Sequence, residues 1–162
     1  TPSSYKDLPY HWKKGFFKMD EENLKSKLKR SKLILGDIKE TSVDFFSKFT
    51  PAPIGAIIND FDFYSSTKVS LSMITKNTNN YLPRVFCYFD DVIGSEVELY
   101  NDYSGERLAI NEFNNENKSI KFSKAYNLLT PGDEIWHHQI WYCHIFEHKN
   151  YNSFISKENQ NL

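Results

Sequence analysis

The chain of 162 residues is about one domain long and holds enough apolar side chains for one sizeable core. Its 20 basic and 21 acidic residues give a net charge of −1, so no overall field favours nucleic acid or an anionic membrane surface as a partner. No apolar run reaches the roughly 18 residues of a membrane-spanning helix, and no signal peptide opens the chain, so we expect a soluble, cytoplasmic protein.

Two helices and a strand are expected in the first third of the chain. Asp20 is a candidate N-cap for an amphipathic helix over residues 21–30. Residues 32–38 predict a short strand that ends at a glycine. Thr41 then opens a second helix, which is closed by Pro51 because proline cannot continue a helix.

The alternation of strands and helices continues through the middle of the chain. Residues 54–59 form a near-continuous apolar strand, and Ser65 or Ser66 could cap the helix that follows it. A second apolar strand over residues 84–89 precedes a helix over residues 106–114. Such alternation predicts an α/β fold with a mostly parallel sheet that helices cover on both sides.

The tail predicts a different arrangement. Residues 119–128 and 139–148 are two extended segments joined by a turn around residues 130–133, so we expect an antiparallel hairpin at the sheet edge. The aromatic side chains of this hairpin would suit packing or a homo-oligomer contact. No low-complexity linker divides the chain, so residues 1–162 are interpreted as a single domain.

Two cysteines, Cys87 and Cys143, lie in aromatic strand-like segments. They form no CxxC pair and no disulfide framework, so buried free thiols are expected.

Paired aspartates come directly after both apolar strands. Asp60 and Asp62 come after the first strand, and Asp90 and Asp91 come after the second. The ends of neighbouring parallel strands meet at one edge of a sheet, so these carboxylates could share one divalent ion. Asp60 and Asp62 share a side of an extended chain, whereas Asp90 and Asp91 both reach one ion only if the chain turns there. Oxygen ligands without histidine or cysteine favour Mg²⁺, Mn²⁺ or Ca²⁺ over zinc.

Less specific interpretations stay open for these side chains. Aspartates also cap helices and terminate strands without any functional role. A zinc site at His144 and His148 with Cys143 is disfavoured, because residues 144 and 148 of one strand lie about 13 Å apart. His137 or His138 could approach the acidic edge as a base or a substrate contact.

The order of these motifs resembles that of class I S-adenosylmethionine-dependent methyltransferases of the macrocin O-methyltransferase type. The resemblance covers roughly residues 33–115, and it is carried by Leu35-Gly36-Asp37 with Thr41, by Asp60-x-Asp62-x-Tyr64-x-Ser66-Thr67, and by Asp90-Asp91. The family implies a Rossmann-like sheet that ends in an antiparallel strand. It also implies Mg²⁺-dependent methylation of a hydroxyl group on a sugar or a similar small molecule.

The resemblance assigns a role to each matching aspartate. It implies that Asp60, Asp90 and Asp91 bind Mg²⁺ or Mn²⁺ and that Asp62 is the general base. The metal would acidify the acceptor hydroxyl, and the base would take its proton before the oxygen attacks the methyl group of S-adenosylmethionine. Asp37 would border the adenine of that cofactor, although a helix N-cap or turn role explains it equally well.

The chain also departs from the family pattern. Residues 92–94 are Val-Ile-Gly where the family has an aromatic side chain after the Asp-Asp pair. No GxGxxG motif is present, because Gly15 and Gly36 are isolated. Asp7-Leu8-Pro9 resembles the segment directly after the second strand of the family, so we expect the C-terminal part of a larger domain. Such a part would bind the cofactor weakly or not at all and would leave one face or edge of its sheet unpaired.

Three functions are therefore compatible with the sequence. The first is a metal-assisted, S-adenosylmethionine-dependent O-methyltransferase. The second is a non-catalytic remnant that acts as a binding or oligomerisation module. The third is a metal-dependent hydrolase or glycosyltransferase, in which an Asp-x-Asp pair would chelate a sugar nucleotide; the second acidic pair fits the methyltransferase order better.

Overall fold

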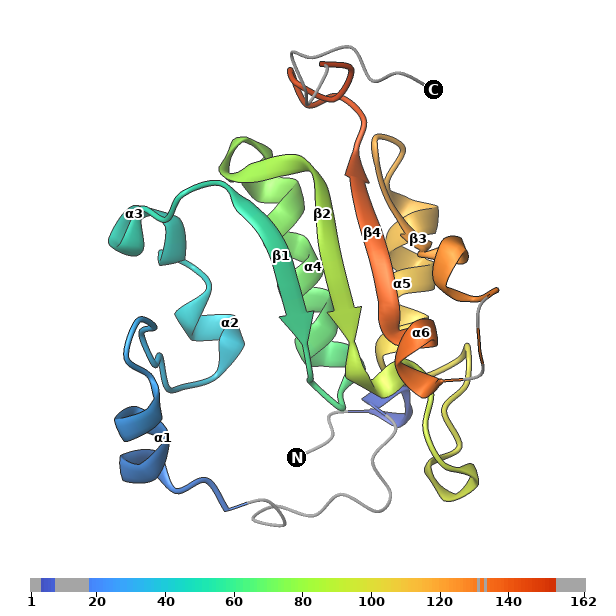
Figure 1. Ribbon diagram of the computed structural model, residues 1–162, viewed down its shortest axis with the longest axis horizontal. Coiled ribbons are helices and arrows are strands. Elements are labelled where there is room, and N and C mark those ends of the chain that lie inside the picture. The colour runs from blue at the N-terminus through green and yellow to red at the C-terminus, as the bar shows by residue number, and fades with distance from the viewer. Residues whose placement is uncertain (1–3, 8–17, 131, 133, 154–162) are drawn as a thin grey trace.

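The structure, a computed structural model, describes residues 4–7, 18–130, 132 and 134–153. A central sheet carries two long helices on one face, and three shorter helices lie beyond one of its edges (Figure 1). No helix in the described part of the chain is both long and apolar enough to cross a lipid bilayer. The expected Asp7-Leu8-Pro9 connection lies outside the described residues from Leu8 on.

The sheet has four strands in the order β1-β2-β4-β3. These strands are β1 (Ile54–Asn59), β2 (Tyr81–Phe89), β3 (Ile120–Lys124) and β4 (Ile140–Ile145). The β1–β2 pair is parallel, whereas the β2–β4 and β3–β4 pairs are antiparallel. The α/β class is therefore confirmed, and the sheet is mixed: β1, β2 and β3 run in the same direction, but β4 runs against them, so only the β1–β2 pair is parallel.

The expected antiparallel hairpin is present in a modified position. β3 and β4 pair as predicted, but β4 lies between β2 and β3, so β3 alone occupies that edge of the sheet. The position is explained by burial, because Cys143 and Ile145 of β4 are almost fully buried and gain from an interior place in the sheet. Of the expected turn, Pro131 and Asp133 lie outside the described residues.

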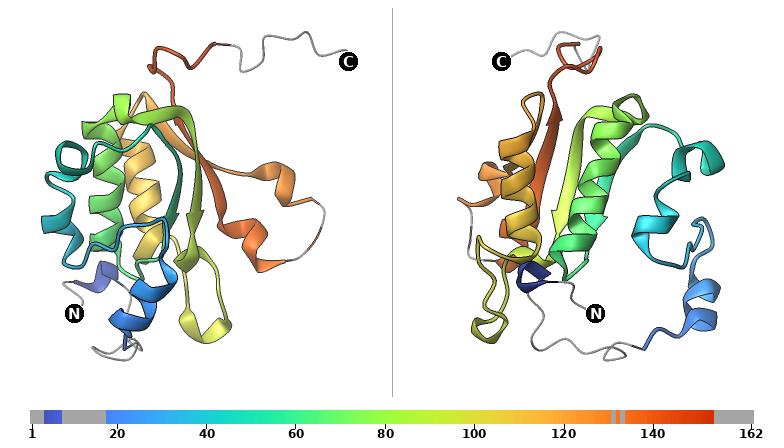
Figure 2. Two further views of the ribbon diagram at one scale, coloured as in Figure 1. Left: turned by 60° about the vertical axis from the view of Figure 1, so that its left-hand side comes forward. Right: turned by 180° about the vertical axis from the view of Figure 1, so that it is seen from behind.

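One face of the sheet forms the core. Helices α4 (Tyr64–Lys76) and α5 (Gly105–Glu116) pack side by side on this face (Figure 2). The core consists of alternate residues of the strands and of one stripe of each helix; its fully or nearly fully buried members include Leu71, Ile74, Val85, Cys87, Phe89, Ala109, Ile110, Phe113 and Phe122. Cys87 and Cys143 are buried free thiols, as predicted.

The opposite face of the sheet is largely uncovered by the described residues. Leu82 and Phe86 of β2 are 46% and 42% exposed, and Ile58 of β1 is 76% exposed. Burial on β2 alternates along the strand, which is typical of a sheet with one core face and one open face. The prediction of helices on both faces is therefore wrong for the described part of the chain, although the open face carries several exposed apolar side chains beside the polar Arg84 and His144.

The segment before β1 differs most from the prediction. Residues 32–38 form no strand, and the segment instead contains α1 (Glu21–Lys27), α2 (Ile38–Thr41) and α3 (Phe45–Phe49). Asp20 caps α1 as predicted, accepting a hydrogen bond from the backbone of Asn23 at 3.0 Å. Thr41 ends α2 and does not open a helix. None of the residues in these three helices is buried.

Short helices complete the described elements: η1 (Tyr5–Asp7), η2 (Thr78–Asn80), η3 (Asp90–Val92), η4 (Glu96–Glu98), η5 (Tyr126–Leu128) and α6 (Ile135–Gln139). The start of α4 is capped from a distance. Neither Ser65 nor Ser66 caps this helix; the buried carboxylate of Asp7 accepts a hydrogen bond from the Ser65 backbone at 2.8 Å. A carboxylate at this position also complements the helix dipole, so η1 is anchored to the sheet layer through α4.

Candidate metal centre

The carboxyl ends of β1 and β2 bring three aspartates together. Asn59 and Phe89, the last residues of the two parallel strands, are paired in register, so Asp60 and Asp90 follow at the same edge of the sheet. Carboxylate oxygens of Asp60, Asp90 and Asp91 lie within 4.8 Å of one another. The structure thus brings these three predicted ligands together, and their role in metal binding stays a prediction.

The chain turns directly after β2. Asp90 and Asp91 belong to η3, a single 3₁₀ turn, so both carboxylates face the end of β1 rather than opposite sides of a strand. This is the turn that the sequence requires if both side chains are to reach one ion.

The donor set suits a hard divalent cation. An ion with oxygen ligands at roughly 2.0–2.6 Å can join oxygens up to about twice that distance apart. Three carboxylates within 4.8 Å meet this condition for Mg²⁺, Mn²⁺ or Ca²⁺. Among the described residues, no other group of three acidic, histidine or cysteine side chains meets it.

Asp62 lies beside the three aspartates without belonging to their group. Its φ of +50° places it in the left-handed region, so the chain is not extended here as the sequence suggested. The backbone N–H of Asp62 donates to Oδ2 of Asp91 at 2.8 Å. Burial, and then the charge of Asp91, raises the pKa of the Asp62 carboxyl to about 6. A group with that pKa exchanges a proton near neutral pH, as a general base must.

Asp91 is held by two side chains that sequence reasoning missed. The Tyr100 hydroxyl donates a hydrogen bond to Oδ1 of Asp91 at 2.7 Å, and Oε2 of Glu106 accepts a hydrogen bond from the Asp91 backbone N–H at 3.0 Å. Glu106 is fully buried on α5, and its other oxygen has no described partner. The sequence could have indicated Glu106, because it lies on the same apolar stripe of α5 as Ala109 and Ile110. A glutamate is rarely buried in such a stripe unless it is paired.

Asp90 is positioned from the other end of the chain. Nε2 of Gln139, the last residue of α6, donates to the backbone oxygen of Asp90 at 2.8 Å and to its Oδ1 at 3.1 Å. The hydroxyl of Tyr88 also donates to Oδ1. No sequence pattern connects Gln139 with Asp90; their contact depends on the antiparallel entry of β4 beside β2.

The carboxyl groups repel one another. Burial and the charges of Asp90 and Asp91 raise the pKa of Asp60 above its ordinary value. Glu106 shows the largest effect, because burial and the nearby Asp91 raise its pKa to about 9. A bound divalent cation would relieve this repulsion, so the electrostatics of the cluster favour cation binding.

Asp37 lies away from a sheet strand end. Its side chain caps the short helix α2 by accepting from the Lys39 backbone at 2.8 Å, which is the alternative role that the sequence left open. The strand that was expected to carry Asp37 is not formed. A role for Asp37 at the adenine therefore stays a prediction.

Two of the histidines lie within hydrogen-bond distance of partners in the described chain. Nδ1 of His137 lies 3.2 Å from the Gly132 oxygen, and Nδ1 of His144 lies 2.9 Å from the Tyr151 hydroxyl. His148 comes after the end of β4 and does not share that strand with His144. The described structure therefore gives no support to the disfavoured zinc site.

Comparison of the chain with protein-family models, curated protein sequences and solved structures finds no match. Its function is therefore inferred from the residues, from the resemblance that their order carries, and from the geometry of the acidic cluster.

Proposed function

We propose that the chain is, or forms part of, a cytoplasmic metal-assisted O-methyltransferase that depends on S-adenosylmethionine. The observation that carries this proposal is the convergence of Asp60, Asp90 and Asp91 at the ends of two parallel strands, with oxygens within 4.8 Å. Asp62 lies against this group, and the four aspartates occur in the order that the methyltransferase resemblance requires.

Each aspartate has a distinct part in the proposed reaction. Asp60, Asp90 and Asp91 would hold Mg²⁺ or Mn²⁺, which supplies Lewis acidity toward the hydroxyl group of a sugar or similar small acceptor. Asp62 would accept the hydroxyl proton, because its raised pKa makes it a stronger base than an ordinary aspartate. Tyr100 fixes the orientation of the Asp91 carboxylate through its 2.7 Å hydrogen bond.

The topology of the sheet supports the methyltransferase proposal, whereas the residues expected to bind the methyl donor do not. The last strand, β4, runs antiparallel to its neighbours, as the last strand of the family does. The sequence has no glycine-rich loop, and Asp37 caps an exposed helix, so neither feature supports a site for S-adenosylmethionine among the described residues.

The metal site can be tested without activity. Calorimetric titration with Mn²⁺ should show one site, and Asp60→Asn combined with Asp90→Asn should weaken it at least about tenfold. The matched control combines Glu96→Gln with Glu134→Gln, which removes two exposed carboxylates outside the cluster and should leave the affinity unchanged. Equal affinities of the wild type and the Asp60/Asp90 variant would refute the site. A separate titration with S-adenosylmethionine would test whether the chain binds the donor.

A second candidate is a non-catalytic module that associates with another copy of itself. The uncovered apolar face of the sheet favours it, with Phe86 packed edge-to-face against Tyr142 at 5.6 Å between ring centroids. Sedimentation would then show a dimer that Ile58→Lys and Phe86→Lys convert to a monomer. A wild-type monomer at micromolar concentration would exclude this candidate.

A further inference from the structure

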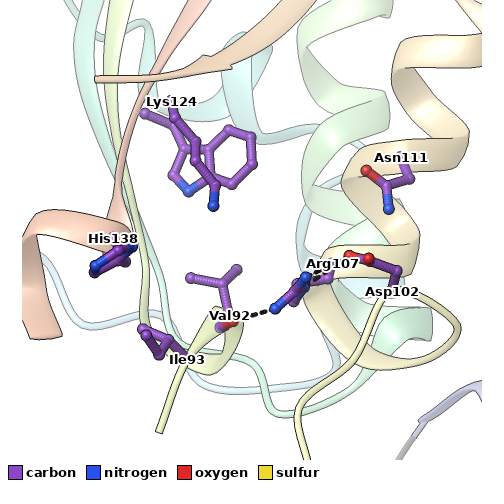
Figure 3. A pocket seen from close by; sticks show the side chains of 8 residues that line it. Val92, Ile93, Asp102, Arg107, Asn111, Lys124 and His138 are labelled. Carbon is purple, nitrogen blue, oxygen red and sulfur yellow. Dashed lines mark hydrogen bonds and ion pairs between the residues drawn. The ribbon is translucent and has the colours of Figure 1, made fainter. Parts of the chain in front are cut away.

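A cavity lies beside the acidic cluster, between α5, α6 and the strands β3 and β4 (Figure 3). Its volume is about 200 Å³, and its wall includes Val92, Ile93 and Trp141. A single water molecule occupies about 30 Å³ of liquid, so the cavity has room for a polyatomic group. None of the four clustered aspartates lines it.

Two nitrogen donors at this cavity lack an acceptor or a counter-charge among the described residues. Nε1 of Trp141 is buried and has no hydrogen-bond partner there. The side chain of Lys124 forms no ion pair within the described chain and lies over the Trp141 ring, with Nζ 5.6 Å from its centroid. Figure 3 shows Lys124 on one side of the cavity, Asn111 and Arg107 on the helix side, and His138 opposite them.

The charges of the lining are mostly positive. Lys124 and Arg107 are cations, and Asp102 is the one carboxylate among the described residues of the wall. Asp102 is already engaged, since its Oδ1 accepts from Nε and Nη2 of Arg107 at 2.9 and 2.6 Å. An orphaned buried indole N–H has an unmet demand for an acceptor, and an anion would meet it while neutralising Lys124.

We propose that this cavity binds the phosphoryl group of a phosphate monoester, through Lys124, the Trp141 indole N–H and the Asn111 amide. These donors come from β3, β4 and α5, so they approach the cavity from three elements. A phosphoryl group offers three terminal oxygens, one for each of these donors, whereas a carboxylate offers two. Val92 and Ile93 offer apolar contact to the organic part of the ligand.

The test uses inorganic phosphate as the probe, at constant ionic strength with chloride as the balancing anion. The chain has 3 tryptophans, so the indole N–H signal of Trp141 can be assigned in a ¹H–¹⁵N spectrum by loss of one signal in Trp141→Phe. Phosphate should shift this signal saturably. Lys124→Gln should weaken binding at least about tenfold, because it removes a charge-assisted hydrogen bond.

Two further variants make the result specific. Lys118→Gln removes an exposed cation outside the cavity and should change the affinity less than about twofold, since a distant surface charge is screened by salt. Asn111→Ala, at an exposed position of α5, should weaken binding several-fold and guards against a folding defect in Lys124→Gln. An immobile Trp141 signal, equal weakening by Lys118→Gln, or acetate binding as tight as phosphate would overturn the proposal. This inference depends on neither the metal nor methyl transfer.

Discussion

Glu106 should make the stability of this protein depend on pH. Its side chain is fully buried, and burial raises its pKa from the ordinary value of 4.5 to about 9. Between these two pH values the unfolded chain has released the Glu106 proton while the folded protein retains it. Folding stability from this group is therefore complete below pH 4.5 and is lost as the pH rises toward 9.

The size of the effect can be calculated from the shift. Each pH unit between the two pKa values costs about 1.4 kcal/mol, so the loss at pH 7 relative to pH 4.5 is roughly 3 kcal/mol. Glu106→Gln removes the titration and keeps an acceptor for the Asp91 N–H. Oε1 of Glu106 has no hydrogen-bond partner among the described residues, so the NH₂ group of the glutamine would have no acceptor there. This lowers the free energy of unfolding of the variant by an amount that does not vary with pH.

The assay is urea denaturation of both proteins at intervals from pH 5 to pH 8, with a chelator present. We subtract the free energy of unfolding of the wild type from that of Glu106→Gln. This difference should rise by about 1.4 kcal/mol per pH unit, because the contributions of the other titrating groups are the same in both proteins and cancel. Glu116→Gln, at an exposed position of the same helix, should show no such slope. A difference that stays constant with pH would refute the reasoning.

Three further predictions concern the remaining described structure. Asp7→Ala removes the buried cap of α4 and should lower the free energy of unfolding by about 1–2 kcal/mol, measured by urea denaturation. The hydrogen bond from Lys6 lowers the pKa of Glu112 to about 2, so the wild type should lose stability as the pH falls from about 4.5 toward 2. Acid titration followed by circular dichroism should show a smaller loss of stability for Glu112→Gln over that range. Cys87 and Cys143 are buried with raised thiol pKa values, so Ellman's reagent should label them only in denaturant; rapid labelling of the native protein would contradict their burial.

The sequence predicts those parts of the fold that depend on a short continuous run of apolar residues. The apolar run that became β1 is recovered with its bounds, and β2 begins at Tyr81 rather than Arg84. Because these strands are parallel and in register, the aspartates after them meet as expected. The candidate metal ligands were predictable because a strand end and its following residue are adjacent in the chain.

The predictions that were wrong or incomplete concern contacts between segments that are distant in the sequence. Residues 32–38 have strand-like composition, but no described strand pairs with them, and Asp37 instead caps α2. Tyr100, Glu106 and Gln139 hold the aspartates from positions that only the folded topology determines. The cap of α4 likewise comes from Asp7, whose separation from Ser65 in the chain hides the contact.

The place of β4 in the sheet constrains the order of assembly. β3 precedes β4 in the chain but has no pairing partner in the described sheet until β4 inserts between it and β2. During synthesis, the edge of β2 and both edges of β3 therefore stay open until the segment ending at Ile145 has left the ribosome. Gln139 directly precedes β4, so its hydrogen bond to Asp90 can form only after this late segment of the chain has been synthesised.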